Sequence, residues 1–169
     1  MDRKPQNKNY GFTLLEVILY LAILSTMVFG IGSFVNLVSV SRVKNQVMTE
    51  VDMQAFQIIQ NITEDIRNAK SIVSPTIGQN QNSLTIINTD DSQKVFVLEG
   101  DTFTVNNGTG AIDLNNNQVL VKELIFKNLS RTETPDIIQI NFTISYNNNS
   151  GNENYNYSKS YVASAYLSK

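Results

Sequence analysis

The chain has 169 residues, enough for one core-bearing domain with an extension and too short for two ordinary domains. It contains neither cysteine nor histidine, which excludes disulfides, thiolate metal sites, a Ser-His-Asp triad and histidine-ligated zinc, and so disfavours an enzyme. The formal net charge is -2, and it becomes -4 when the first eleven residues are left out (thirteen basic minus three, fifteen acidic minus one), so nucleic acid is not indicated as a partner.

An uncharged apolar stretch, VILYLAILSTMVFGIGSFV, occupies residues 17–35. At a rise of about 1.5 Å per residue it forms roughly 28 Å of helix, close to the hydrocarbon thickness of a bilayer. Three basic residues precede the stretch within the first eleven positions, whereas Arg42 and Lys44 follow it together with nearby acids. The positive-inside tendency therefore predicts a single-pass protein of the cytoplasmic (inner) membrane, with its N-terminus in the cytoplasm and its C-terminal domain outside.

Glu16 lies inside the apolar segment, which begins at Phe12. An acidic residue within a membrane helix is costly unless it finds a partner, and such a residue is usually functional. Cleavage between Gly11 and Phe12 would free an α-amino group about one helical turn from Glu16, near a helix N-terminus that already favours a carboxylate. We therefore expect Glu16 to guide subunit assembly by pairing with such an amine. A plain, uncleaved signal anchor is the alternative.

The stretch Gly11-Phe12-Thr13-Leu14-Leu15-Glu16-Val17, after a short basic leader and before an apolar run, resembles the type IV prepilin signal. Type IV pilins share that signal with the pseudopilins of type II secretion and competence systems. The resemblance implies that a prepilin peptidase removes a leader of residues 1–11, cutting after Gly11, that Phe12 becomes N-methylated, and that Glu16 serves assembly. It also implies other pilin or pseudopilin subunits, an assembly ATPase and a platform protein as partners.

The apolar pattern continues beyond the membrane segment. Apolar residues recur every three or four positions from Val43 to Ala69, and no proline interrupts the chain from Phe12 until Pro75. This predicts one helix over 12–71, with 12–40 as a transmembrane and filament-core part and 41–71 as an amphipathic continuation. Gly30 and Gly32 lie inside this predicted helix, where glycine lowers helix stability relative to alanine. They serve either close helix packing in the membrane or local unwinding on leaving it, and both readings stand.

The C-terminal half changes to a period of two residues. Residues 72–82 are expected to be a connection and 83–169 a β-rich globular domain, with turn signals at 99–101 and 106–108. The expected strands are 83–88, 94–99, 101–106, 118–129, 136–146 and 155–166. One antiparallel sheet with a face on the helix would bury both apolar stripes, so the sequence predicts an α+β fold, and the resemblance implies that this fold is pilin-like.

Acidic and amide residues offer candidate metal sites. Asp113-Leu-Asn115-Asn-Asn117 begins like a calcium loop, but its sixth position is Gln118 rather than Gly and its twelfth is Leu124 rather than Glu. A solvated turn is the better reading. The pairs Glu99 with Asp101 and Asp90 with Asp91 belong to no ordered ligand set. No metal site and no cofactor is therefore predicted.

An acidic pair and a set of three tyrosines can each be interpreted as functional or as structural residues. Glu64-Asp65 has the composition of a catalytic pair, but its helical context favours solvated surface. Tyr155, Tyr157 and Tyr161 alternate with polar residues and are expected to share a strand face, for packing or for binding a partner.

The leading hypothesis is a structural subunit, a minor pilin or pseudopilin rather than an enzyme. The stretch Ile66-Arg67-Asn68-Ala69-Lys70-Ser71-Ile72, before a β-rich half, resembles minor subunits of the J or W type. The alternative is an uncleaved, single-span, membrane-anchored extracytoplasmic binding module. The sequence leaves open which machine uses the subunit.

Overall fold

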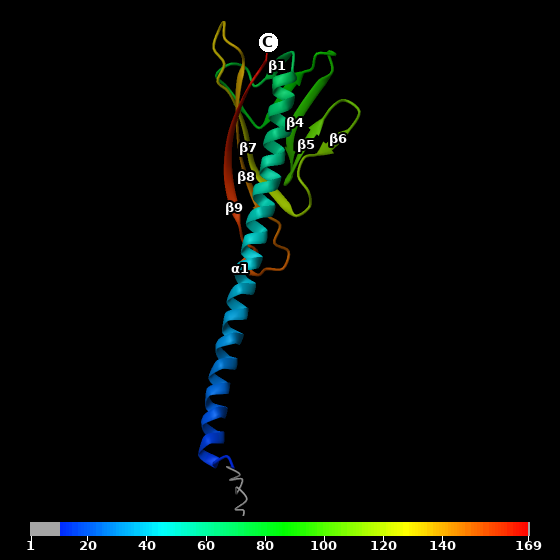
Figure 1. Cartoon of the computed structure of the whole chain (residues 1–169). Coiled ribbons are helices and arrows are strands. Elements are labelled where there is room, and N and C mark those ends of the chain that lie inside the picture. Colours follow the sequence, from blue (N-terminus) through cyan, green and yellow to red (C-terminus); the bar gives the residue numbers. More distant parts are fainter. Residues whose placement is uncertain (1–10, 169) are drawn as a thin grey trace, which may run out of the picture. The chain divides into compact units, whose positions relative to one another are not determined.

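The computed structural model describes residues 11–168, and the chain divides into two compact units, one ending at Arg42 and the other beginning at Val43. Within the described residues, one helix, nine strands and a 3-10 turn make up the regular structure. Figure 1 shows how they are arranged along the chain. In chain order these elements are α1 (Leu14–Asn68), β1 (Ser71–Ser74), β2 (Asn80–Gln81), β3 (Ser83–Ile87), β4 (Gln93–Glu99), β5 (Thr102–Asn106), β6 (Ala111–Asp113), β7 (Val119–Asn128), β8 (Ile137–Tyr146), η1 (Glu153–Tyr155) and β9 (Ser158–Tyr166).

The described part of the first unit is the apolar beginning of α1. Its helical pattern runs without a break from Leu14 through Gly30 and Gly32. Its large apolar side chains are exposed, from Phe12 at 75% to Leu37 at 67%. Such a surface is stable only against lipid or other apolar helices, because exposing this much contiguous apolar area to water is unfavourable.

The second unit buries one stripe of α1. The side chains that point inward are Val47, Val51, Ala55, Ile58, Ile62 and Ile66, as the spacing of the apolar residues predicts. The helix ends at Asn68, three residues before the predicted end at residue 71. Beyond it, Ala69 remains buried and the main-chain N–H of Lys70 donates to the carbonyl of Ile87 at 2.7 Å. The strand pairing of Ser71 with Ile87 therefore takes over where the helix was expected to continue.

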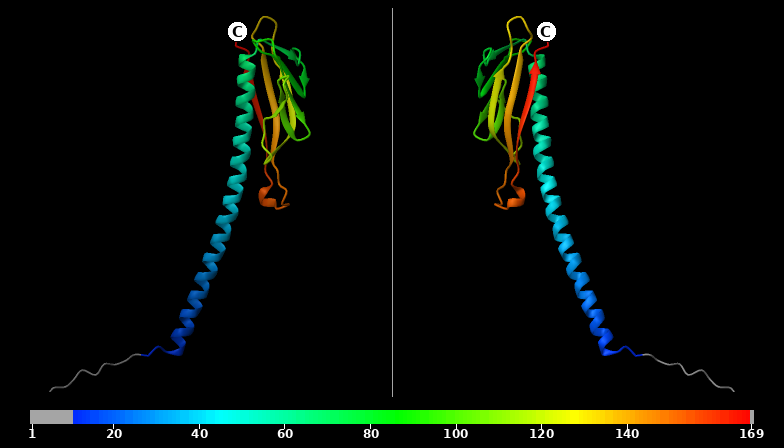
Figure 2. Two further views of the ribbon diagram at one scale, coloured as in Figure 1. Left: turned by 90° about the vertical axis from the view of Figure 1, so that its right-hand side faces the viewer. Right: turned by 90° about the vertical axis from the view of Figure 1, so that its left-hand side faces the viewer.

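Two antiparallel sheets form where the sequence predicts one. The first has the strand order β1-β3-β4-β5-β6 and the second the order β2-β7-β8-β9. Both sheets and the second part of α1 contribute to a single apolar core, in which Phe96, Phe103, Phe126 and Phe142 are the largest buried side chains. In Figure 2 the strands of this unit lie along one side of α1. Alternation in a sequence shows that a strand has a buried face, but it does not show which strand is its neighbour.

The longer strands lie close to their predicted ranges, whereas three short strands were not predicted. Strands β3, β4, β5, β7 and β8 lie within a residue or two of the expected ranges. Strands β1, β2 and β6 have two to four residues each, and the first two occupy part of the expected connection at 72–82. Strands this short carry too few residues for a periodic signal.

Local irregularities shape the longer strands and their turns. Strand β7 has a bulge between Val121 and Glu123, which keeps both Val121 and Leu124 on the core side. The expected turns are confirmed: Gly100 and Gly108 adopt φ of 65° and 86°, values that favour glycine, in the β4–β5 and β5–β6 hairpins. Strand β9 begins at Ser158 rather than at residue 155, because Glu153–Tyr155 forms η1.

Candidate functional site

The Gly11–Phe12 peptide bond lies in exposed, non-helical chain directly before α1. Gly11 is exposed, and a Cβ atom built on it would meet nothing within 4 Å. Phe12 is 75% exposed, and the helix begins two residues later at Leu14. A protease binds its substrate in an extended conformation, so a bond outside the helix is accessible for cleavage. The expected leader of residues 1–11 falls outside the described residues except for Gly11.

Thr13 caps the first turn of α1. Its side-chain hydroxyl oxygen accepts a hydrogen bond from the main-chain N–H of Glu16 at 3.3 Å, and its carbonyl accepts from Glu16 and from Val17. This is the usual geometry of an N-cap residue, which satisfies one of the unpaired N–H groups at a helix start. Thr13 and Glu16 also have the spacing of a capping box. That spacing is the sequence signal by which Thr13 could have been singled out.

Glu16 lies in the first turn of α1 and is half-buried. Its Oε1 atom accepts a hydrogen bond from the hydroxyl of Tyr20, one turn later, at 2.9 Å. The ring of Tyr20 in turn packs edge-on against the ring of Phe12, with centroids 6.4 Å apart and planes inclined by 76°. Phe12, Glu16 and Tyr20 therefore lie together on one face of the helix start. The sequence predicts the first two as site residues, but Tyr20 was missed.

The hydroxyl groups of the apolar stretch 17–35 all donate hydrogen bonds within the helix. Ser25, Thr26 and Ser33 donate to main-chain carbonyls three or four residues earlier, at 2.7, 2.8 and 3.1 Å, and Tyr20 donates to Glu16. In a bilayer there is no water to satisfy such donors, so a membrane helix has to satisfy them internally. Within residues 11–168, α1 is the one helix long and apolar enough to cross a membrane.

Gly30 and Gly32 lie in the middle of the apolar stretch, in unbroken helix. A Cβ atom built on either glycine would meet nothing within 4 Å. Nothing within residues 11–168 therefore requires glycine at these two positions. The two readings that the sequence leaves open, contacts with other helices and a change of helix conformation, therefore both stand.

The loop that begins like a calcium site is a structural link. The carbonyl oxygen of the Asn115 side chain accepts the main-chain N–H of Phe103 at 2.7 Å, and its amide donates to the carbonyl of Val119 at 2.9 Å. Asn116 donates to Glu50 on α1 at 2.9 Å. Asn115 is buried, and both ends of its side-chain amide are used in these bonds to the main chain. The loop therefore ties the two sheets and the helix together.

Three of the four other acidic candidates have a polar partner of their own, and the fourth, Glu99, is exposed at the end of β4. Asp91 is 2.5 Å from Lys70, and Asp101 is 2.9 Å from Lys122. Hydrogen bonds from the Ser92 hydroxyl, and then from its main-chain N–H, lower the pKa of Asp90. Across the described part of the chain, no three acidic side chains come together in a group that could hold a metal ion.

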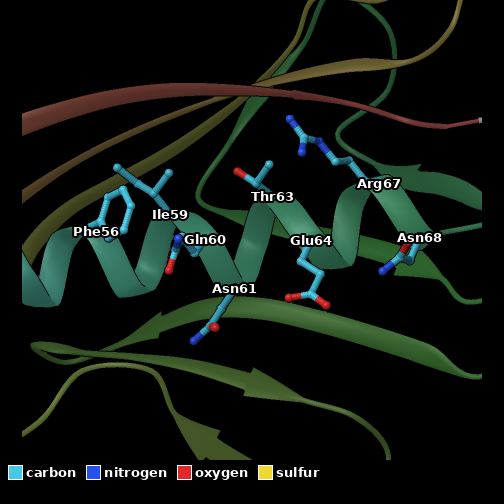
Figure 3. A pocket seen from close by; sticks show the side chains of 8 residues that line it. All are labelled: Phe56, Ile59, Gln60, Asn61, Thr63, Glu64, Arg67 and Asn68. Atoms are coloured by element: carbon cyan, nitrogen blue, oxygen red, sulfur yellow. The ribbon is translucent and has the colours of Figure 1, made fainter.

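The adjacent acids Glu64 and Asp65 point to different surroundings. Asp65 forms a half-buried ion pair with Lys94 of β4, with 2.6 Å between Oδ1 and Nζ. Glu64 instead lines an open hollow of about 520 Å³, whose walls are residues of α1 between Phe56 and Asn68 (Figure 3). In this view Glu64 and Asn61 extend to one side of the helix and Thr63 and Arg67 to the other. The two carboxylates therefore form no catalytic pair.

The three tyrosines expected on one strand face are divided between three places. Tyr155 is in η1 and stacks on Tyr146, with ring centroids 6.0 Å apart, and Tyr157 precedes β9. Tyr161 is in β9 and stacks on Phe142 at 5.6 Å. The expectation that all three share one strand face is wrong, because Tyr155 belongs to the 3-10 turn η1 and β9 begins only at Ser158. The packing reading holds for Tyr157 and Tyr161, which both pack against the core.

Tyr161 also reaches α1. Its hydroxyl donates to Asp52, which forms an ion pair with Lys159 at 3.0 Å. Burial, and then the hydrogen bond to Asp52, raises the pKa of Tyr161 to about 12. Hydrogen bonds from Tyr161 and then Lys159 lower the pKa of Asp52, and the hydrogen bond to Asp52 raises the pKa of Lys159. This cluster attaches the edge strand β9 to the helix and forms a structural contact.

Comparison with protein families assigns the N-terminal segment. Residues 6–32 match the model of the prokaryotic N-terminal methylation motif, so the match covers Gly11, Phe12, Glu16, Tyr20 and both helix glycines. Searches of curated proteins and of solved structures found no match. The matched motif starts the long apolar helix, and the same helix packs on antiparallel sheets in the second unit. This chain therefore bears the prokaryotic N-terminal methylation motif, at the start of a helix that is long and apolar enough to cross a membrane.

Proposed function

We propose that the chain is a structural subunit of a filament of the type IV pilus, type II secretion or competence kind, and not an enzyme. A prepilin peptidase removes the leader after Gly11, Phe12 is methylated at its new amine, and α1 carries the subunit into the filament. The observation that carries this proposal is the placement of Glu16. It is the one charged side chain between Gly11 and Ser41, and it lies one turn into the helix that starts beside the accessible Gly11–Phe12 bond.

Cleavage changes the charge at the helix start. Hydrolysis of the Gly11–Phe12 bond leaves a carboxylate on the released leader and an amine on Phe12, which is protonated near neutral pH. In apolar surroundings opposite charges attract far more strongly than in water, whereas an unpaired charge is expensive. Glu16 of one subunit therefore pairs with the amine of the next. If two helices are shifted along their axes from this register, the carboxylate stays unpaired, and that arrangement is energetically unfavourable.

The N-terminus is proposed to lie in the cytoplasm and the β-rich unit outside it, because three basic residues precede the span within the first eleven positions. This role implies several partners: the prepilin peptidase, other pilin or pseudopilin subunits, the assembly ATPase and the platform protein. A minor subunit of the J or W type remains the finer proposal. It is supported by the stretch from Ile66 to Ile72, where α1 ends and β1 begins.

Gly30 and Gly32 are proposed to serve the assembled filament. Alanine favours a helix by nearly 1 kcal/mol per residue over glycine, and the space around both positions is open in the single chain. A subunit with alanine at both positions should therefore insert into the membrane normally and enter filaments less well, whether the glycines serve close packing or local unwinding.

The assembly role is tested with three variants of the full chain in its native host. Gly11→Val should leave the leader attached, and Gly11 is exposed in open space, so the fold should tolerate the change. Glu16→Gln should be cleaved and inserted but depleted from filaments. Glu99→Gln, an exposed acid at the end of β4, is the control and should assemble normally.

The variants separate the two functional readings. Normal entry of Glu16→Gln into filaments would overturn the assembly role of that carboxylate. An unprocessed wild-type chain in the native membrane would favour the alternative, an anchored extracytoplasmic binding module.

A further inference from the structure

Glu16 has a hydrogen-bond partner within its own helix. The Tyr20 hydroxyl donates to Oε1 of Glu16 at 2.9 Å. A hydrogen bond to a charged acceptor is stronger than one between neutral groups, and this difference increases where water is absent. The bond therefore reduces the penalty of holding a carboxylate among apolar side chains.

Tyr20 differs from every other hydroxyl residue of the apolar stretch 17–35. Ser25, Thr26 and Ser33 return their hydrogen bonds to main-chain carbonyls of the helix, which any serine or threonine in a membrane helix does. The phenol of Tyr20 is the one hydroxyl in this stretch that donates to a side chain. The bond is thus a specific pairing of two side chains.

The ring of Tyr20 places this pairing beside the cleavage position. It packs edge-on against Phe12, and Phe12, Val17, Tyr20, Leu21 and Leu24 line one apolar surface hollow of about 420 Å³. Glu16 and Tyr20 are four residues apart and share one helix face, and the ring contact places Phe12, which precedes the helix, beside Tyr20. Tyr20 therefore contacts both the residue that gains the amine and the carboxylate that would receive one.

A carboxylate can accept several hydrogen bonds through its two oxygens. The Tyr20 hydroxyl contacts one oxygen of Glu16, Oε1, and leaves lone pairs for a second donor. A side chain held in this way has fewer orientations to lose when that donor arrives, so pairing costs less conformational entropy.

We propose that Tyr20 is the positioning residue for Glu16: its hydroxyl orients the carboxylate on the Phe12 face of the helix, ready to receive the α-amine of a neighbouring pilin-like subunit. The inference rests on the proposed function and adds to it a residue that sets the direction of the pairing. In this proposal Tyr20 acts through Glu16, whose carboxylate receives its hydrogen bond.

The test compares Tyr20→Phe with Ser25→Ala in the full chain, expressed in the native host. Tyr20→Phe keeps the ring and its packing on Phe12 but removes the hydroxyl. Ser25→Ala removes a hydroxyl from the same stretch that bonds only to the backbone. For each variant we would measure the cleaved chain in the membrane and the share recovered in sedimented filaments.

Tyr20→Phe should be cleaved and inserted like the wild type but should enter filaments about tenfold less, as the loss of one hydrogen bond to a charged group implies. Ser25→Ala should behave like the wild type. Adding Tyr20→Phe to Glu16→Gln should produce no further loss, because the hydroxyl acts through the carboxylate. The infrared carboxylate band assigned by the Glu16→Gln difference spectrum should shift in Tyr20→Phe and stay in place in Ser25→Ala.

Filament entry of Tyr20→Phe equal to that of Ser25→Ala, or an unshifted carboxylate band, would overturn the role of Tyr20. If Glu16→Gln is depleted from filaments at the same time, the proposed function stands and only this inference fails. If Glu16→Gln also assembles normally, both fail.

Discussion

The main-chain N–H of Glu16 donates to the hydroxyl oxygen of Thr13 at 3.3 Å, which fixes the start of α1 directly after the Gly11–Phe12 bond. Glu16, the charged residue of the apolar segment, is thus held at its backbone by Thr13 and at its carboxylate by Tyr20. The start of the helix and the orientation of the charge are set by two neighbouring hydroxyl groups.

Removing the Thr13 hydroxyl should loosen this start. Thr13→Ala leaves the Glu16 N–H without its side-chain acceptor, which should destabilise the first helical turn by about 1 kcal/mol. Hydrogen exchange of the Leu15, Glu16 and Val17 amides in the detergent-solubilised protein measures the effect. Thr13→Ser keeps the cap and should exchange like the wild type, and equal exchange in all three proteins would contradict the capping role.

The second unit should depend on Asn115 more than on its neighbours. Asn115→Ala leaves the main-chain N–H of Phe103 and the carbonyl of Val119 without their partners in the core, at a cost of about 2–4 kcal/mol. Asn117 is exposed, and Asn117→Ala should change stability by no more than about 0.5 kcal/mol. Denaturant unfolding compares the two variants, and equal midpoints would show that the buried amide is dispensable.

Most of the helix could be predicted from the sequence, because a long apolar stretch and a stripe of spaced apolar residues are local signals. The stripe from Val47 to Ile66 is buried as expected. The end of α1 was placed three residues late, because Ala69 fits the stripe equally well as a buried residue before β1. The helix ends at Asn68 because the following residues pair as β1 with β3, a long-range contact that a local sequence pattern does not show.

The candidate site was only partly predictable for a similar reason. Glu16 stands out in a sequence because a charge in an apolar stretch is conspicuous. Tyr20 does not, since a tyrosine in a membrane helix is common, and only the positions of its hydroxyl and ring reveal its two contacts. Likewise Asn115 lies in an asparagine-rich loop, and nothing in the loop's composition distinguishes this buried amide from those of Asn116 and Asn117.

The ion pair between Asp65 and Lys94 should contribute to stability, because both side chains are only 27% exposed. Lys94→Met should lower the free energy of unfolding by about 1–2 kcal/mol, between the values for surface and buried pairs. Lys70→Met is the matched control, since Lys70 and Asp91 are 57% and 72% exposed, and it should cost about 0.5 kcal/mol or less. Similar losses of unfolding free energy in both variants would contradict the expectation that burial strengthens the ion pair.

Stability at alkaline pH should depend on Tyr161. Its pKa in the folded protein is raised from 10.0 to about 12, so the folded state binds this proton more tightly than the unfolded state does. The resulting stabilisation is fully present below pH 10 and is lost as the pH rises from 10 towards 12. Tyr161→Phe removes this proton, so the difference in thermal midpoint between wild type and variant should shrink across that range. A constant difference would contradict the raised pKa.

The most direct test of the assembly account is the intact mass and N-terminal sequence of the chain extracted from the membranes of its native host. The account predicts a chain that begins at Phe12, lacks residues 1–11 and carries one methyl group on its terminal amine. A chain that still begins at Met1 with its basic leader attached would contradict it, because Glu16 would then have no new amine with which to pair.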